Sequence, residues 1–152
     1  MGKVTAEIIL VNHYDEMLYK DSKITAEQIR RIDVPDAVVD SGATMLSLNR
    51  EVIKTLGLEK SGTKKANTAD GIFELDTYSS VRLKIGDREG LFEVMELRHP
   101  KIRALIGQIP LEVFDLLIHP GINRLIPNPF HDNQLILDQL LTEDILSHGF
   151  ER

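Results

Sequence analysis

The chain contains one short box in which a carboxylate is followed by small and polar residues: Asp40, Ser41, Gly42, Ala43 and Thr44. The apolar residues 37–39 come directly before it and predict a β-strand that ends at Asp40. Gly42 allows the backbone to turn sharply at this point and leaves its own amide accessible. A carboxylate presented in this way can take a proton from a water molecule. The Asp-Ser-Gly tripeptide is short enough to arise by chance, so the residues around it must show whether it is functional.

A short helix is predicted directly after the box, within residues 46–57. Asn49 is a suitable N-cap, and Gly57 stands just past the expected end of the helix. Leu48 and Ile53 have the spacing of a hydrophobic staple around that N-cap. The box therefore lies between a predicted strand and a predicted helix.

Two further elements follow along the chain. Asp70 and Gly71 form a turn signal between two strand-like runs, because Gly71 can adopt a positive φ, and they predict a β-hairpin that is a candidate flap. Later, an apolar strand ends with Ile106 and Gly107. Pro110 then stands at a plausible first position of another helix.

In this order, the Asp-Ser-Gly-Ala-Thr box, the helix, the Asp-Gly hairpin and the Leu-Ile-Gly element resemble those of the retropepsin-like aspartic proteases, with small bacterial members the most similar. The resemblance covers residues 4–129, and the order of four elements is more specific than any one of them. It implies a mainly β fold, the closed β-barrel of the acid proteases, with one or two short helices and two pseudo-twofold halves. Gln108 departs from the viral members, which have at that position an arginine that stabilises the dimer.

The resemblance also implies a mechanism that needs two carboxylates. One ionised carboxylate takes a proton from water, while a protonated neighbour polarises the scissile carbonyl. Because the chain carries one box, the simplest arrangement is a homodimer in which two Asp40 side chains meet at the twofold axis. The substrate would be a peptide or protein bound as an extended strand. The residues assigned to the active-site loop, the flap and a structural second loop are Ser41, Gly42, Ala43, Thr44, Asp70, Gly71, Ile106 and Gly107.

Two alternatives from other classes remain open. The chain could be a noncatalytic dimerisation or peptide-binding module that shares the fold, or an unrelated β domain with a chance Asp-Ser-Gly. The intact residues Asp40, Ser41 and Gly42 favour the enzyme, since a binding module has no need of that carboxylate. In an unrelated domain, Asp40 would be a turn aspartate that caps its own loop.

Composition excludes several other classes of protein. With 152 residues, of which 42% are hydrophobic, the chain is long enough for one core but too short for two lobes of pepsin size. A net charge of -6 and the lack of a long basic run argue against binding to nucleic acid. The chain has no cysteine, and its five histidines show no metal-ligand spacing. We expect no metal and no cofactor.

Apolar runs along the chain and the pattern of its last residues give expectations about location and domain organisation. No apolar run approaches the roughly 18 residues of a membrane span, so a soluble, cytoplasmic protein without membrane partners is expected. Residues 1–129 are predicted to form the protease domain, and residues 130–152 an amphipathic helical extension. The residues that mark this extension are a cap at Asp132 or Asn133, an apolar face of Leu137, Leu140, Leu141 and Ile145, and a stop at Gly149.

Overall fold

The computed structural model describes residues 3–119, 121–131 and 134–136. The predicted C-terminal helix, with its apolar face from Leu137 onward and its caps, lies outside these residues. The domain boundary at residue 129 therefore stays a prediction.

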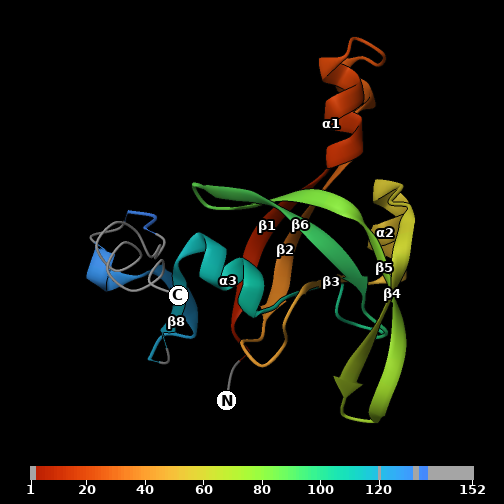
Figure 1. The fold of residues 1–152 in the computed structure, drawn as a ribbon. Helices are drawn as coiled ribbons and strands as arrows, with labels where there is room; N and C mark the ends of the chain where they lie inside the picture. Colours follow the sequence, from red (N-terminus) through yellow and green to blue (C-terminus); the bar gives the residue numbers. More distant parts are fainter. Residues whose placement is uncertain (1–2, 120, 132–133, 137–152) are drawn as a thin grey trace, which may run out of the picture.

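Nine strands among the described residues make the fold mainly β (Figure 1). Six of them form a closed barrel, because the sheet order β1-β2-β7-β3-β6-β5 is completed by a pairing of β1 with β5. β4 pairs with β5 outside this ring, and β8 and β9 form a separate two-stranded sheet. This arrangement confirms the predicted acid-protease fold. The strands are β1 (Thr5–Asn12), β2 (Arg31–Val39), β3 (Leu46–Leu48), β4 (Lys60–Thr68), β5 (Gly71–Ile85), β6 (Arg88–Glu96), β7 (Ala104–Ile106), β8 (Leu116–His119) and β9 (Arg124–Pro127).

The described residues contain three α-helices, one more than the one or two predicted: α1 (His13–Lys20), α2 (Arg50–Leu56) and α3 (Gln108–Phe114). Two short 3-10 turns, Ala26–Gln28 and Pro129–His131, accompany them.

α2 has the predicted N-cap, since the Asn49 side chain accepts a hydrogen bond from the Val52 amide at 3.0 Å. Its predicted stop is also confirmed, because Gly57 is left-handed with a φ of 65°. With eight residues, α1 is the longest described helix, and none of the three could cross a bilayer.

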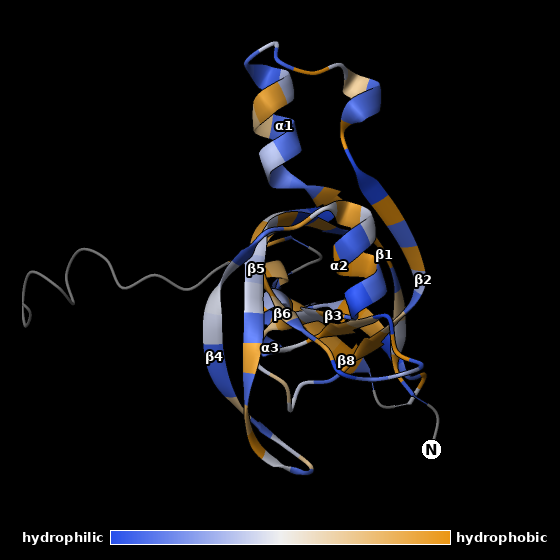
Figure 2. Cartoon of the chain, turned by 90° about the vertical axis from the view of Figure 1, so that its right-hand side faces the viewer, coloured by the Kyte–Doolittle hydropathy of each residue, from blue (hydrophilic) through white to orange (hydrophobic). Residues whose placement is uncertain are grey.

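Alternating strand residues fill the barrel with apolar side chains. Ile8 and Leu10 of β1 and Val81 and Leu83 of β5 are fully buried, as the period of two in the sequence predicts. Phe114 at the end of α3 closes one side, where its ring packs edge-on against Phe92 with centroids 5.4 Å apart. Figure 2 shows the inner strands β3 and β6 as largely apolar, whereas β4 is largely polar. The core thus lies inside the ring, and the β4–β5 hairpin stands outside it.

The helix α1 projects from the end of the barrel where β1 leads into β2 (Figure 1). The Asn12 side chain begins this helix by accepting from the Asp15 amide, and it donates to the Leu56 carbonyl at 2.7 Å. Asp15 is buried and accepts from the guanidinium and the backbone amide of Arg30, each at 2.9 Å. These contacts tie the start of the projection to α2 and join its two ends to each other.

We expect Asp15→Asn to destabilise the protein by about 1–3 kcal/mol near neutral pH, because hydrogen bonds to a charged group are lost. Hydrogen bonds from the Arg30 guanidinium hold the pKa of Asp15 below its usual value. The stabilisation is therefore complete above the unfolded pKa of about 3.9 and is lost as pH falls through the lower folded pKa. Urea unfolding should show a gap between wild type and variant that closes below about pH 4. Glu27→Gln, at an exposed site on the same projection, is the control; a gap unchanged at pH 3 would contradict the assignment.

Candidate active site

Asp40 lies where two parallel strands end side by side. β2 pairs with β7 through Val38 with Leu105 and Val39 with Ile106, and the Asp40 amide then donates to the Ile106 carbonyl at 3.0 Å. The pairing fixes the backbone at the start of the box. This places the carboxylate at a strand end, as the sequence predicted.

The turn after Asp40 orients the carboxylate. Its Oδ1 accepts a hydrogen bond from the Gly42 amide at 2.8 Å, and the Ala43 amide donates to the Asp40 carbonyl at 3.1 Å. Asp40 and Gly42 are exposed in the single subunit. The carboxylate is thus held by its own loop and open to solvent.

Ser41 does not orient the carboxylate in the part of the chain that the structure describes. Its side chain is exposed, and its hydroxyl makes no hydrogen bond to the part of this subunit that the structure describes. The Gly42 amide performs the orientation, because it is the donor that reaches the carboxylate. The Ser41 hydroxyl is therefore available for contacts outside the subunit. Thr44 is likewise exposed.

The loop around Gly107 is hydrogen-bonded to the box that carries Asp40. The amides of Gln108 and Ile109 donate to the carbonyls of Ala43 at 2.8 Å and Thr44 at 2.9 Å. A Cβ atom on Gly107 would lie 2.6 Å from the Met45 carbonyl oxygen and 2.7 Å from the Thr44 carbonyl carbon. Only a glycine allows this close approach of two backbones. The fully buried Ile106 comes directly before it.

The prediction that Pro110 opens the following helix was wrong by two residues. Gly107 is the N-cap of α3, so Gln108 is the first helical residue and Pro110 the third. A proline is tolerated there, because the amides of the first turn have no intrahelical acceptor.

The predicted hairpin is formed by β4 and β5, which pair from Lys60 with Tyr78 out to Thr68 with Gly71. The two loop residues are Ala69 and Asp70, so Gly71 begins β5 and does not lie within the loop. It still needs to be a glycine, since its φ is 120°. The Thr68 hydroxyl donates to the Gly71 carbonyl at 2.9 Å and accepts from the Asp70 amide at 3.3 Å.

The hairpin and the Asp40 loop extend from the same end of the barrel, opposite α1 (Figures 1 and 2). Two apolar residues next to the hairpin tip are open to solvent, with Ile72 71% and Phe73 41% exposed. A peptide lying at this end would meet both the carboxylate and the hairpin. Two cavities of the described residues lie elsewhere, at the start of α2 and beside α3, and Asp40 lines neither of them. Asp40 is exposed, so the described residues do not enclose the candidate site.

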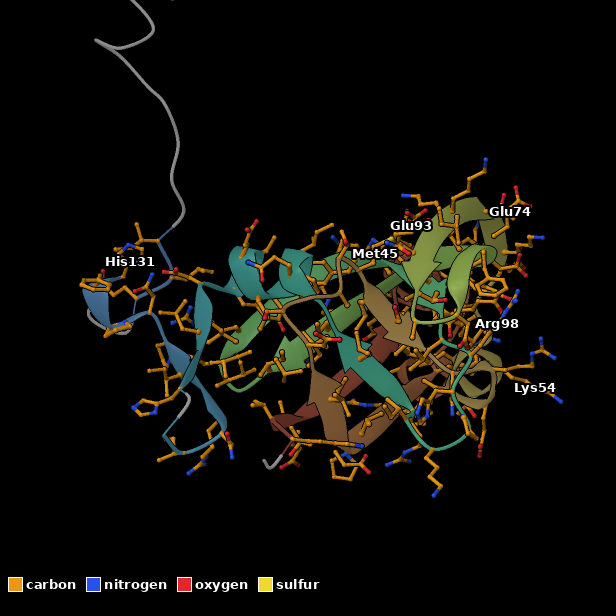
Figure 3. The ribbon with its side chains drawn as sticks, turned by 90° about the horizontal axis from the view of Figure 1, so that it is seen from below. Met45, Lys54, Glu74, Glu93, Arg98 and His131 are labelled. Atoms are coloured by element: carbon orange, nitrogen blue, oxygen red, sulfur yellow. The ribbon has the colours of Figure 1, made fainter. Side chains whose placement is uncertain are left out.

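Asp115 belongs to a separate polar cluster beyond α3. Its side chain accepts from the Asn128 amide group at 3.1 Å and contacts the His131 ring, and its pKa is lowered chiefly by the hydrogen bond with His131. His131 lies at the opposite end of the molecule from Glu74 and Arg98 (Figure 3). Asp115 thus binds the segment that follows β9 through Asn128 and His131.

A family model described as aspartyl protease matches residues 29–109. The chain belongs to this retropepsin-like family. The matched part of this aspartyl protease family member contains the box, the hairpin and Gly107, and it ends at the second residue of α3. No curated protein sequence matches the chain significantly. Family membership confirms the resemblance inferred from the order of the elements.

Sequence reasoning did not single out Glu96 and Arg98, two charged residues that bond the β5 strand of the hairpin. The available signal was a charged residue in the otherwise alternating run from Leu91 to Leu97. Glu96 is buried because it shares the inward side of β6 with Val94 and Phe92, two and four residues before it.

Proposed function

We propose that the protein is an aspartic endopeptidase whose active form is a homodimer with one Asp40 from each subunit at the catalytic centre. The observation that carries the proposal is the exposed Asp40 carboxylate, held by the Gly42 amide at the end of β2 in a member of the aspartyl protease family. The chain has one such box, and peptide hydrolysis by this route needs two carboxylates. A second copy supplies the missing group.

In this mechanism the two Asp40 side chains share one proton, because two close carboxylates do not both ionise. The ionised carboxylate takes a proton from water, and the water oxygen attacks the carbonyl carbon of the scissile bond. The protonated carboxylate donates a hydrogen bond to the carbonyl oxygen. The tetrahedral intermediate collapses when the C–N bond breaks and a proton from the dyad passes to the leaving amine.

An apolar strip next to the box supports association of two copies. Ile109, Val113 and Leu117 are 43%, 37% and 42% exposed, and Ile109 is bonded through its amide to Thr44 of the Asp40 loop. Ile109 and Val113 are four residues apart on α3, so they share one face of that helix. We place the subunit interface on this strip, since it is continuous with the loop that must reach the twofold axis.

The substrate class that fits this geometry is an extended peptide. The hairpin can offer main-chain hydrogen bonds to such a strand, and the exposed Ile72 and Phe73 offer apolar contacts for its side chains. Recognition of this kind tolerates many sequences, because the main chain is common to all peptides.

Specific activity should fall when the enzyme is diluted below the dissociation constant of the dimer. The physical reason is that a monomer holds only one of the two Asp40 carboxylates that the mechanism needs. Peptide hydrolysis per subunit should be measured over a dilution series beside the fraction of dimer in each sample. An unchanged specific activity in samples that are fully monomeric would overturn the shared-dyad proposal.

A further inference from the structure

The hairpin leaves the barrel at a defined point on β5. β5 pairs with β6 from Ile85 as far as Thr77, which lies opposite Met95. Beyond Thr77, residues 71–76 of β5 pair with β4 alone among the strands that the structure describes. One edge of β5 therefore loses its backbone partner where the hairpin begins.

β6 does not continue along this edge, because it ends at Glu96 and the chain after it keeps only the pairing with β3 on the opposite edge. The Leu97 amide donates to the Leu48 carbonyl at 2.8 Å, next to the pairing of β3 with β6. In an antiparallel pair, alternate residues direct their amide and carbonyl to the same neighbour. Asp76 and Glu74 are two apart on β5, so both present backbone groups at the edge that β6 has left.

Side chains from the end of β6 take over at these two residues. Glu96 Oε1 accepts from the Asp76 amide at 3.0 Å, and the Arg98 guanidinium donates to the Glu74 carbonyl at 3.3 Å. Arg98 also donates to Glu96 Oε1 at 2.9 Å. The Glu96 and Arg98 side chains thus add two hydrogen bonds along the edge of β5 after its backbone pairing with β6 has ended. Figure 3 shows Glu74 and Arg98 at the hairpin end of the molecule.

The burial of Glu96 gives this contact its strength. Its side chain is 9% exposed, and a carboxylate removed from water in this way is costly unless it is paired and hydrogen-bonded. The Asp76 amide and the Arg98 guanidinium meet that need, while Arg98 itself is 59% exposed. Other ion pairs of the hairpin, such as Lys64 with Glu93 at 3.0 Å, join exposed side chains and contribute little.

We propose that Glu96 and Arg98 form a clamp that sets the angle of the β4–β5 hairpin over the peptide-binding end of the protein. This inference rests on the proposed protease function and names the residues that position its flap. The clamp holds β5 at Glu74 and Asp76 and leaves the tip from Gly71 to Phe73 free to close. Glu96 and Arg98 are positioning residues, since they act through the hairpin and not on the reacting atoms.

Loss of the clamp should weaken peptide binding more than the chemical step. In Arg98→Ala, the KM for a peptide substrate should rise about tenfold, the factor expected for a lost hydrogen bond to a charged group, while kcat changes little. Arg98→Lys should recover part of the effect, because the lysine retains a charged donor. Arg103→Ala is the matched control: it removes a half-buried arginine that pairs with Asp36 of β2 and not with a residue of the hairpin. If KM were the same in Arg98→Ala and the control, the positioning role would be wrong.

Amide exchange tests the clamp independently of catalysis. The Asp76 amide should exchange about tenfold faster in Arg98→Ala and Glu96→Gln than in wild type, while the amide of Leu83 in the barrel keeps its rate. The same measurement on proteins that also carry Asp40→Asn separates the two proposals. If the Asp76 amide exchanged faster in the clamp variants but wild type hydrolysed no peptide, the protease proposal would be contradicted and the clamp would stand. Exchange at Asp76 equal to that in Arg103→Ala would contradict the clamp.

Discussion

Asp40→Asn is expected to abolish peptide hydrolysis while the fold and the association of subunits persist. An amide cannot take the proton of the attacking water, and the loss of general acid–base catalysis lowers the rate by about 10²–10⁴-fold. The carboxamide oxygen can still accept from the Gly42 amide, so the loop should keep its conformation. Hydrolysis of a peptide mixture by purified wild type and variant is the measurement, with circular dichroism and sedimentation of both.

The control for this experiment is Asp33→Asn, an exposed carboxylate on the same strand β2. It should hydrolyse peptides as fast as wild type. Equal rates for wild type and Asp40→Asn would show that another group, or a contaminating protease, performs the reaction. A wild type that binds peptides without cleaving them would instead support the noncatalytic binding module.

Gly107→Val is expected to be among the most destabilising single substitutions in the chain. Its Cβ would lie within 2.9 Å of three backbone atoms of residues 43–45, and backbone cannot move aside as a side chain does. Overpacking of this kind costs about 1–3 kcal/mol or more. Any relief must displace the loop that carries Asp40, so activity should fall in the fraction that still folds. Urea unfolding measures the loss of stability.

Gly62→Ala provides the matched control. A Cβ there would lie 3.6 Å from the Thr77 hydroxyl oxygen, an ordinary contact, and stability should change by less than about 1 kcal/mol. Equal stability of the two variants would show that the Gly107 loop can shift freely. The second loop would then not be the rigid support of the Asp40 turn.

Features encoded by neighbouring residues were predictable from the sequence. Local signals predict the strand that ends at Asp40, the caps of α2 at Asn49 and Gly57, and the positive φ of Gly71. The order of such elements also identified the family, because each family places them in a fixed sequence. Local chemistry and its order along the chain were sufficient for the fold class.

Features that depend on residues distant in sequence were not predictable. α1 carries a polar, charged sequence, and its attachment depends on Asn12 with Leu56 and on Asp15 with Arg30. Position 107 needs a glycine because its backbone lies against that of residues 43–45, more than 60 positions earlier in the chain. Nothing in the sequence shows that Glu96 bonds the Asp76 amide. The orientation of Asp40 by Gly42 required the geometry of the turn.

The most direct test of the shared catalytic centre is a mixing experiment with wild-type and Asp40→Asn subunits. The two proteins are unfolded together, refolded at constant total concentration and assayed for peptide hydrolysis over a range of wild-type fractions. If each active site needs an Asp40 carboxylate from both subunits, activity follows the square of the wild-type fraction, so an equal mixture retains about one quarter of the activity. Activity proportional to the wild-type fraction, about one half in the equal mixture, would show that each subunit acts alone and would contradict the account.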